Sequence, residues 1–531
     1  MADSRLQLDS GFPVSNGTAD ANGLTVSKRP PLELRRMRPP GPPPSADQPP
    51  TPDPGRPPVL LLHGASAQHQ TFFIPKGRSL AEFLWDEGYE PWLLDWRGSR
   101  RVTDSMSDSD LESFRDELDF DRAEEDLRSA LKRIAEVRDR EGEPQKIHVV
   151  AHCIGAGVLA QAIAKGTVPL GRLGHVVLLT LGLFYETPLD GKLKSQFRVL
   201  DRLWKEGSVA IIDPRDPSDK ERWPPALKKV YEEIGARWRP HPDADRESDS
   251  SHALCNRISF MYGVPYRHSN LVDQIHGVHR VGFAAGCLEP GVGERICAVD
   301  SGEKLAGDKS LAQRLGEHDG LGFVYHVHLV SGTWREKNAE GTLELSGSVG
   351  EFQNGNCDLW ADDRKIGECR GKRLGHDVPN ALEEQFGGIP LRMYLHGAQN
   401  VRRGWAGRFV NPSSSSKKGS MGDMSYIDDD PLKRFRGLPS VTLITGAENQ
   451  LWHPDSIDRM YQWLTNGQKD ASRPVRRHVV SGYAHQDLLW GQNAMKDVFP
   501  LILRDGLGGN GTSIPFDPME PPSGPGPSSN A

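Results

Sequence analysis

One stretch of fourteen residues determines the fold of this chain: Ile147-His148-Val149-Val150-Ala151-His152-Cys153-Ile154-Gly155-Ala156-Gly157-Val158-Leu159-Ala160. Apolar residues with strand preference lead into Ala151, and helical spacing begins after Gly155. The pattern predicts a strand, a sharp turn and a helix, with the side chain of Cys153 at the apex of the turn. A turn this tight requires small residues two positions before and two positions after the apex, and Ala151 and Gly155 meet that requirement.

This arrangement resembles the nucleophile elbow of α/β-hydrolases, with Cys153 in place of the usual serine. A thiol at the amino end of a helix is stabilised as the thiolate, which is the nucleophilic form. The competing interpretation is a buried, inert thiol between a core strand and a helix, which is common for cysteine. The rest of the chain has to distinguish the two.

Length and composition limit the class of protein. The chain has 531 residues, enough for a large core, and its net charge of −7 gives no reason to expect a nucleic-acid partner. No apolar run approaches the roughly 18–20 residues that span a bilayer, and the amino terminus lacks the apolar core of a secretory signal. The six cysteines form no CxxC pair, which argues against a zinc site. We therefore expect a cytoplasmic protein without a metal or other cofactor.

The order of apolar runs predicts an α/β protein. Strands expected near residues 59, 92, 147 and 175 alternate with helices expected over 78–88 and 119–139. The pattern stops after 182 and returns with two strands at 441–446 and 477–480. This indicates a doubly wound, mostly parallel α/β-hydrolase sheet, with a large lid and β insertion between the sixth and seventh core strands.

The same pattern divides the chain into five segments. Within the insertion, 185–315 has helical and loop character and 321–400 has strand composition. In the amino-terminal arm, Arg35-Arg36-Met37-Arg38 is a basic patch that either contacts a partner or an anionic surface or, as is more common, is solvated. The predicted segments are a disordered arm (1–56), the first part of the core (57–184), the insertion (185–437, with a flexible loop at 411–430), the second part of the core (438–504) and a disordered tail (505–531).

Three further positions complete a candidate catalytic site around Cys153. His485 follows the last strand after a short turn, where a base that deprotonates the thiol belongs. His63-Gly64 ends the first core strand, so the backbone N–H of Ala65 is one expected oxyanion donor. The backbone N–H of Ile154 is the other. His152 adjoins the thiol but should point away from the apex, which makes it a poor base.

The group that orients the histidine departs from the usual pattern. The expected carboxylate position after the strand at 441–446 is occupied by Asn449, in Gly446-Ala447-Glu448-Asn449. An amide can orient an imidazole in thiol enzymes, so Asn449 is our first choice. Glu448 is the second, and Glu186, after the strand near 175, is a third.

Four stretches together resemble a known family. The elbow at 151–155, Gly446-Ala447-Glu448-Asn449 and Gly482-Tyr483-Ala484-His485-Gln486-Asp487 are joined by a long middle motif, Asn256-Arg257-Ile258-Ser259-Phe260-Met261-Tyr262-Gly263, followed by Tyr266-Arg267-His268. They resemble the α/β-hydrolase domain found fused to cholesterol-oxidase-like GMC flavoproteins, over about 58–500. The resemblance implies that the cysteine, the asparagine and the final histidine are family traits. More distantly, the elbow is similar to that of polyhydroxyalkanoate synthases, and the lid layout is similar to that of acid lipases.

The chain lacks the glycine-rich fingerprint of a flavin domain, so oxidase activity does not carry over. Tyr262, Tyr266 and His268 either line a substrate pocket or anchor the lid by packing. Our first hypothesis is an enzyme in which Cys153 cleaves or transfers an acyl group from an ester or thioester of an apolar, lipid-, sterol- or polyketide-like substrate. The alternative is a non-catalytic accessory protein that partners a separate flavin-dependent oxidase.

Overall fold

The computed structural model describes the core of the chain and parts of the insertion. The described residues are 7–13, 32–38, 55–142, 144–188, 385–413, 429–447, 449, 451–466, 474–481, 483–491 and 493–511, with short pieces between 192 and 212 and the strands between 297 and 370.

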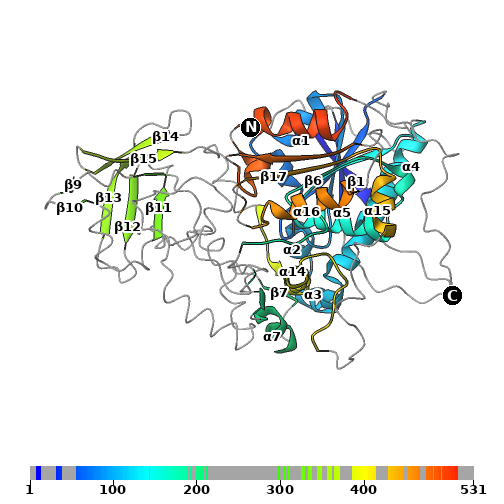
Figure 1. Ribbon diagram of the computed structural model, residues 1–531, viewed down its shortest axis with the longest axis horizontal. Coiled ribbons are helices and arrows are strands. Elements are labelled where there is room, and N and C mark those ends of the chain that lie inside the picture. Colours follow the sequence, from blue (N-terminus) through cyan, green and yellow to red (C-terminus); the bar gives the residue numbers. More distant parts are fainter. Residues whose placement is uncertain are drawn as a thin grey trace.

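The core is one eight-stranded sheet with the order β1-β2-β4-β3-β5-β6-β17-β18 (Figure 1). Every neighbouring pair from β4 to β18 is parallel, and β2 runs antiparallel to both of its neighbours. This confirms the predicted doubly wound, mostly parallel sheet. The strands are β1 (Gln7–Pro13), β2 (Glu33–Arg38), β3 (Pro58–Leu62), β4 (Glu90–Asp95), β5 (Ile147–His152), β6 (Leu173–Leu179), β17 (Val441–Gly446) and β18 (Val475–Val480).

Helices cover both faces of the sheet. Helix α1 begins after a capping box made by Ser79 and Glu82, and Phe83 on it contacts Phe499 from the carboxyl-terminal segment, so these two segments share one face. Helices α4, α5, α15 and α16 lie on the other side in Figure 1. Their bounds are α1 (Leu80–Asp86), α4 (Phe120–Arg140), α5 (Ile154–Lys165), α15 (Asp429–Arg436) and α16 (Asp455–Thr465). The smaller elements are η1 (His69–Phe73), α2 (Arg100–Asp104), α3 (Asp108–Phe114), η2 (Arg115–Glu117), η3 (Leu170–Arg172), α17 (Asp487–Trp490), α18 (Ala494–Asp497) and the π-helical turn η6 (Leu501–Gly506).

The strand order places the candidate residues at one edge of the sheet. From β3 the chain moves to β4 on one side and later to β5 on the other, so the switch in direction lies between β3 and β5. In such sheets ligands bind at the carboxyl ends of the strands near this switch. The β3 strand ends just before His63, β5 ends just before Cys153, and the His485 loop follows β18.

The amino-terminal arm is more ordered than the sequence suggested. Glu33–Arg38, within the segment predicted to be disordered, forms β2 and pairs with β4. Leu34 and Met37 are fully buried, and the Arg36 side chain reaches Glu90 and Glu141 in the interior. The prediction of a solvated basic patch is therefore wrong: Arg36 is buried and pairs with two carboxylates that lie far away in the sequence, and Arg35 is buried and pairs with the nearby Glu33. β1 (Gln7–Pro13) also belongs to this arm and pairs with β2.

The Arg36 ion pairs lead to the first testable prediction. Arg36→Met would leave Glu90 and Glu141 buried with one cation fewer, and burial already raises the pKa of Glu90 in spite of Arg36 and Arg138. We expect a loss of about 3 kcal/mol in the free energy of unfolding, measured by urea denaturation. The control is Arg172→Met, because the pair that Arg172 forms with Asp139 is partly exposed; it should cost less than about 1 kcal/mol. Equal losses in the two variants would contradict this account of β2.

The insertion lies between β6 and β17, the sixth and seventh strands of the core sheet in chain order, as predicted. One of its sheets has six strands, in the order β11-β12-β13-β14-β15-β8. The prediction of strand for the whole of 321–400 is wrong at its end, because α14 occupies Leu391–Arg403, where Leu391, Leu395, Ala398 and Val401 are buried at helical spacing. The other elements are α7 (Val199–Glu206), β7 (Ile211–Ile212), β8 (Cys297–Ala298), β9 (Lys304–Leu305), β10 (Lys309–Ser310), β11 (Val324–His328), β12 (Thr333–Lys337), β13 (Glu344–Val349), β14 (Asn356–Ala361), β15 (Arg364–Arg370) and β16 (Ile389–Pro390).

Two other predicted segments, the tail after residue 504 and the flexible loop at 411–430, can be compared with the structure. Order continues past residue 504: Leu507 is buried, and the Tyr89 hydroxyl donates a hydrogen bond to its carbonyl oxygen at 3.0 Å, so the predicted boundary at 505 is wrong. Most of the predicted flexible loop at 411–430 lies outside the described residues. Among the described helices, none is long and apolar enough to cross a membrane.

Candidate active site

The turn between β5 and α5 has the geometry that the sequence predicted. Cys153 stands between the two elements with φ 58° and ψ −130°, a conformation that is rare for a residue with a side chain. Its N–H donates to the carbonyl of Leu179 at 3.1 Å, and its own carbonyl accepts from Ala156 and Gly157. Backbone strain of this kind persists only where the surroundings impose it, and it concentrates at functional sites.

Glycines allow the neighbouring loop to approach the turn. A Cβ at Gly155 would lie 2.4 Å from the carbonyl oxygen of His63, and one at Gly64 would lie 2.9 Å from the Cβ of Cys153. These contacts bring the loop after β3 directly against the thiol. The predicted requirement for a small residue at Gly155 therefore has a physical cause, the backbone of His63.

The loop after β3 is fixed by contacts from three directions. Ser66 has φ 60° and donates its N–H to Gly98 at 2.7 Å. Its hydroxyl donates to Gly388 at 2.9 Å and lies 3.1 Å from the hydroxyl of Tyr394 on α14. Within the described part of the chain, no acceptor bonds the backbone N–H of Ala65, the predicted oxyanion donor next to this serine. The loop is thus held rigidly while that N–H is left available.

The buried carboxylate of Asp95 supports the same loop from the end of β4. Asp95, at the end of β4, accepts from the backbone N–H of His69 at 2.8 Å and lies 2.6 Å from its Nδ1 atom. The Nε2 atom of His63 lies 3.4 Å from Asp95, and the Nε atom of Arg35 lies 3.8 Å from it. Burial opposes the charge on Asp95, but the two histidines hold the pKa of this carboxyl well below its usual range. Asp95 was not singled out from the sequence, where it is only the polar end of an apolar strand.

The His485 loop lies against the elbow. The Nε2 atom of His152 is 3.1 Å from the carbonyl oxygen of His485, and the two rings are 4.8 Å apart between centroids. Gly446 permits this approach, because a Cβ there would lie 2.1 Å from the carbonyl oxygen of Tyr483. The Trp490 indole donates to Thr71 at 2.9 Å and ties the loop to η1. The loop that carries His485 thus lies beside His152, the residue before Cys153. The action of His485 on the Cys153 thiol stays a prediction.

His152 is expected to make the stability of the folded protein depend on pH. Burial, and then the nearby His63, lower the pKa of His152 to about 4, so it is neutral at pH 7. The unfolded chain binds this proton near pH 6.5, so stability falls as pH drops from about 6.5 to about 4.

We expect His152 to account for about 2 kcal/mol of the stability lost between pH 7 and pH 5. His175, whose pKa burial also lowers to about 4, acts in the same direction, so the comparison must be with a variant. Thermal unfolding of His152→Gln, which keeps a donor for the His485 carbonyl, should show the smaller slope. The exposed His453→Gln should match wild type, and identical slopes in all three proteins would contradict the role of His152.

Of the predicted orienting groups, the two within the described residues, Asn449 and Glu186, have other bonding partners. Asn449 is buried, but its Oδ1 atom accepts from the N–H groups of Leu451 and Trp452, both at 3.0 Å, which caps its own loop. Glu186 is paired with Arg459 and Lys192. The role of Asn449 thus has no support in these contacts and stays a prediction. Glu448 and the predicted pocket residues Tyr262, Tyr266 and His268 lie outside the described residues.

Two residues that the sequence did not reveal face the elbow from the side of the insertion. A Cβ added at Gly157 would lie 2.5 Å from the hydroxyl oxygen of Tyr185. Burial, with the neighbouring Cys153, raises the pKa of Tyr185, while the facing Asn400 side chain on α14 opposes the rise. Neither residue belongs to a local motif, so only their distance from Cys153 in space could identify them.

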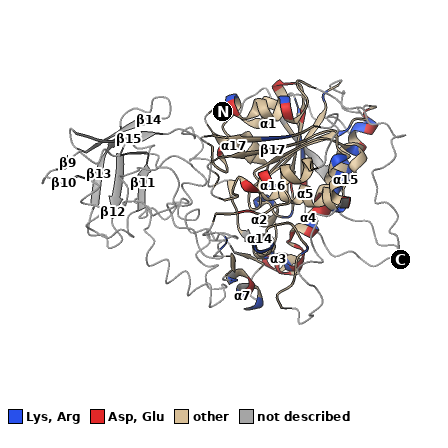
Figure 2. Ribbon diagram, viewed as in Figure 1, with Lys and Arg blue, Asp and Glu red and all other residues tan. Residues whose placement is uncertain are grey.

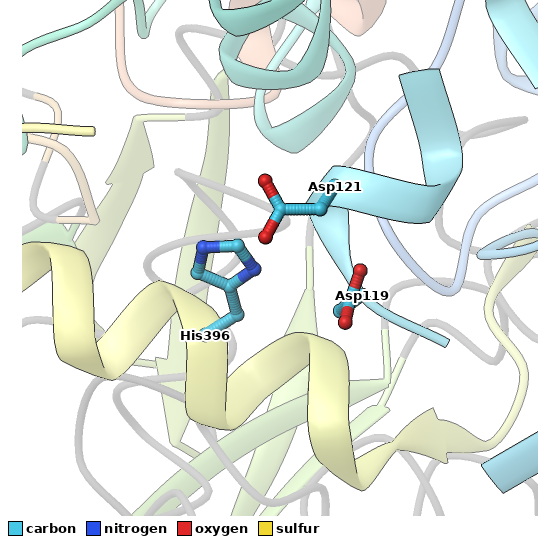
Figure 3. A group of neighbouring side chains, drawn as sticks. All are labelled: Asp119, Asp121 and His396. Carbon is cyan, nitrogen blue, oxygen red and sulfur yellow. The ribbon is translucent and has the colours of Figure 1, made fainter. Parts of the chain in front are cut away.

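A second group of titratable side chains joins α4 to α14 (Figure 3). Asp119, Asp121 and His396 place one possible ligand atom each within 4.8 Å of the others. His396 is satisfied as a neutral ring, because its Nδ1 atom accepts from Phe120 at 3.3 Å and its Nε2 atom lies 2.6 Å from the Gly407 carbonyl. The carboxylates are bonded by Arg392 at 2.7 Å and Lys165 at 3.3 Å. The group therefore serves as a hydrogen-bonded clamp between the two helices.

Comparison with known proteins bears on the fold of the core. Residues 59–274 match a model of the alpha/beta hydrolase family. A search of curated proteins gave no match.

Solved structures that resemble the chain include an epoxide hydrolase from Vigna radiata, with 14% identity over 94% of this chain and 98% of the other and a TM-score of 0.37. Epoxide hydrolase I of potato (Solanum tuberosum) has 12% identity over 91% and 94%, with a TM-score of 0.36. A dienelactone hydrolase from Anabaena variabilis has 18% identity over 33% and 63%, with a TM-score of 0.22. All three TM-scores are low, so these structures do not assign the fold. The assignment of the α/β-hydrolase fold to the core rests on the family match and on the strand order.

Proposed function

We propose that this chain, whose core has the α/β-hydrolase fold, is a cysteine-dependent acyl hydrolase or acyltransferase that acts on an ester or thioester. The observation that supports this most strongly is the backbone of Cys153, held at φ 58° between a buried strand and a helix amino terminus. An inert core cysteine has no need of that conformation. The strain presents the thiol at the carboxyl edge of the sheet, where substrates of such folds bind.

The proposed reaction has two half-steps. His485 takes the proton of the Cys153 thiol, and the thiolate attacks the acyl carbon to form a C–S bond. The tetrahedral intermediate collapses, the bond to the leaving oxygen or sulfur breaks, and His485 returns the proton to the leaving group. Water or an acceptor hydroxyl, deprotonated by His485, then attacks the acyl-thioester and regenerates the thiol.

The oxyanion is assigned to two backbone donors. The N–H of Ala65, in the loop that Gly155 allows against Cys153, is one; the N–H of Ile154, the first residue of α5, is the other. Fixed donors cost no reorganisation when charge develops on the substrate oxygen. The Ser66 contacts to Gly388 and Tyr394 are what keep the first donor in place.

The proposed substrate is apolar near the reacting carbon. Cys153 is surrounded by buried apolar side chains and by Tyr185, and the insertion adds α14 on that side. Removal of water strengthens the electrostatic contribution of the oxyanion donors. The insertion is large enough to cover a lipid-, sterol- or polyketide-like acyl group, as lids do in other enzymes.

The test is a substrate panel combined with intact-protein mass spectrometry. Purified protein is incubated with p-nitrophenyl esters and with matching N-acetylcysteamine thioesters of increasing acyl length, with and without an added primary alcohol. The proposal predicts release of the leaving group and a covalent mass increase equal to one acyl group, mapped to Cys153. Faster turnover with the alcohol identifies transfer. Absence of both turnover and the acyl adduct across the panel counts against the proposal.

A further inference from the structure

A positively charged cavity lies between α7 and α14, away from the elbow. Its volume is about 530 Å³, within the range of small-molecule sites. Five cationic side chains line it, and Asp201 is the carboxylate among its lining residues, so the formal charge of the lining is +4. The whole chain, in contrast, is acidic. The cations are Arg198, Arg202, Lys205, Arg402 and Arg403; Figure 2 shows basic residues in blue on α7.

The carboxylate in the cavity is already used. Asp201 pairs with Arg402 at 3.0 Å. Within the described part of the chain, no carboxylate lies within ion-pair distance of Arg198, Arg202 or Lys205. Burial is the main cause of the lowered pKa of Arg402; Asp201 opposes it, and the guanidinium of Arg198 adds a smaller contribution in the same direction as burial. A cavity with this surplus of positive charge is stabilised by an anion.

Three of the cations, Arg198, Arg202 and Lys205, are exposed, but the elements on either side of the cavity are tied together by buried and partly buried contacts. Arg403 donates to the Oδ1 atom of Asn400 and to the Arg408 carbonyl, both at 2.9 Å, so its guanidinium is fixed. Trp204 on α7 packs under the guanidinium of Arg115 at 4.1 Å. Its indole donates to Asn411, at 3.1 Å, from the segment after α14. The two walls thus keep their spacing.

The backbone at the rim of the cavity is also unusual. Arg198 has φ 53°, and the other non-glycine residues with positive φ in the described ranges are Ser66, Cys153 and Thr180. Those three lie at the elbow or in the loops next to it. A strained arginine in a cationic cavity follows the same pattern of strain held for function.

We propose that this cavity binds a phosphorylated small molecule, with a diphosphate group as the chemistry that fits it best. Arginine forks match phosphate oxygens with paired hydrogen bonds, and several such donors around one concave site select for multiple negative charges. The negative charge of a diphosphate is close in magnitude to the formal charge of +4 on the lining residues. The volume of the cavity leaves room for the organic group attached to the diphosphate. This site does not depend on the acyl chemistry proposed for Cys153.

The wall of the cavity is connected to the elbow through α14. Arg403 bonds Asn400, and the Asn400 side chain faces Tyr185 next to Cys153. Gly407 donates its N–H to the same Asn400 oxygen at 3.1 Å. A ligand that engages Arg403 would therefore contact the same hydrogen-bonded group that packs against the candidate nucleophile.

The test is isothermal titration of the full chain with pyrophosphate at constant ionic strength. The informative variant is Arg202→Gln with Lys205→Gln, since both side chains are exposed and outside the elbow. The matched control is Lys132→Gln with Arg504→Gln, which removes the same charge from exposed positions elsewhere. We expect saturable binding in wild type and control, and at least about 10-fold weaker binding in the cavity variant. Citrate, which carries similar charge on carboxylates, should bind more weakly than pyrophosphate.

Three results would overturn the proposal. The first is that pyrophosphate shows no saturable binding to wild type, and the second is that its affinity falls equally in the cavity and control variants. The third is that citrate binds as tightly as pyrophosphate. Thermal unfolding of both variants is recorded alongside, and we expect wild-type transitions because exposed charges contribute little to stability. A cavity variant that unfolds early is replaced by the single variant Arg202→Gln, for which the same comparison applies.

Discussion

Alanine in place of Cys153 is expected to reduce ester and thioester turnover by at least about 10³-fold, the largest effect that any single substitution should have on activity. The side chain at the apex of the turn carries the atom that forms the covalent bond, so nothing nearby can replace it. The backbone geometry belongs to the strand and helix, and the buried side chain is small. We therefore expect a folded protein with a nearly unchanged unfolding transition.

Two further cysteine variants sharpen this measurement. Cys153→Ser should also lose most activity, because a hydroxyl needs a stronger base than a thiol does, and Asn449, in the usual carboxylate position, caps its own loop. Cys357→Ala, in β14, controls for the loss of one thiol and should match wild type. Residual turnover in Cys153→Ala close to that of Cys357→Ala would place the reaction elsewhere in the protein.

Gly155→Ala is expected to have the second-largest effect, and it should lower both activity and stability. The added Cβ would meet the His63 carbonyl oxygen at 2.4 Å, and backbone cannot yield as a flexible side chain can. Either the loop that carries Ala65 moves or α5 moves, and both displace the oxyanion donors from Cys153. We expect a loss of about 2–3 kcal/mol in unfolding free energy and at least about 100-fold in kcat.

The chain offers a matched control for this substitution. A Cβ added at Gly171, in η3 (Leu170–Arg172), would meet none of the described atoms within 4 Å, and the φ of this glycine is not positive. Gly171→Ala should therefore leave kcat unchanged and keep or slightly raise stability. If Gly155→Ala behaved like Gly171→Ala in both assays, the proposed packing of the loop on the elbow would be wrong.

What the sequence could predict is what its local patterns encode. The elbow and the loops that follow β3 and β18 could be predicted because each consists of a strand end followed by small or polar residues, and these ends meet at one edge of a parallel sheet. Helix α4 was found because its apolar residues repeat at helical spacing over 21 residues.

What the sequence could not predict depends on partners far away along the chain. β2 was missed because Arg36 is polar by composition, and it is buried only because Glu90 and Glu141 meet it in the fold. Tyr185 and Asn400 reach the elbow from separate segments with no motif between them. Helix α14 was overlooked because the strand-like composition before it masked its own helical spacing.

The central claim is that Cys153 is an activated nucleophile with His485 as its base, and alkylation rates test it most directly. Limiting iodoacetamide is applied across pH 5–9, and mass spectrometry locates the label, with a small apolar reagent used in parallel so that access does not limit the result. We predict that Cys153 reacts first with an apparent pKa well below the ~8.5 of a free thiol, and that His485→Ala removes this advantage. An inert Cys153 towards both reagents, while other cysteines are labelled, would contradict the claim.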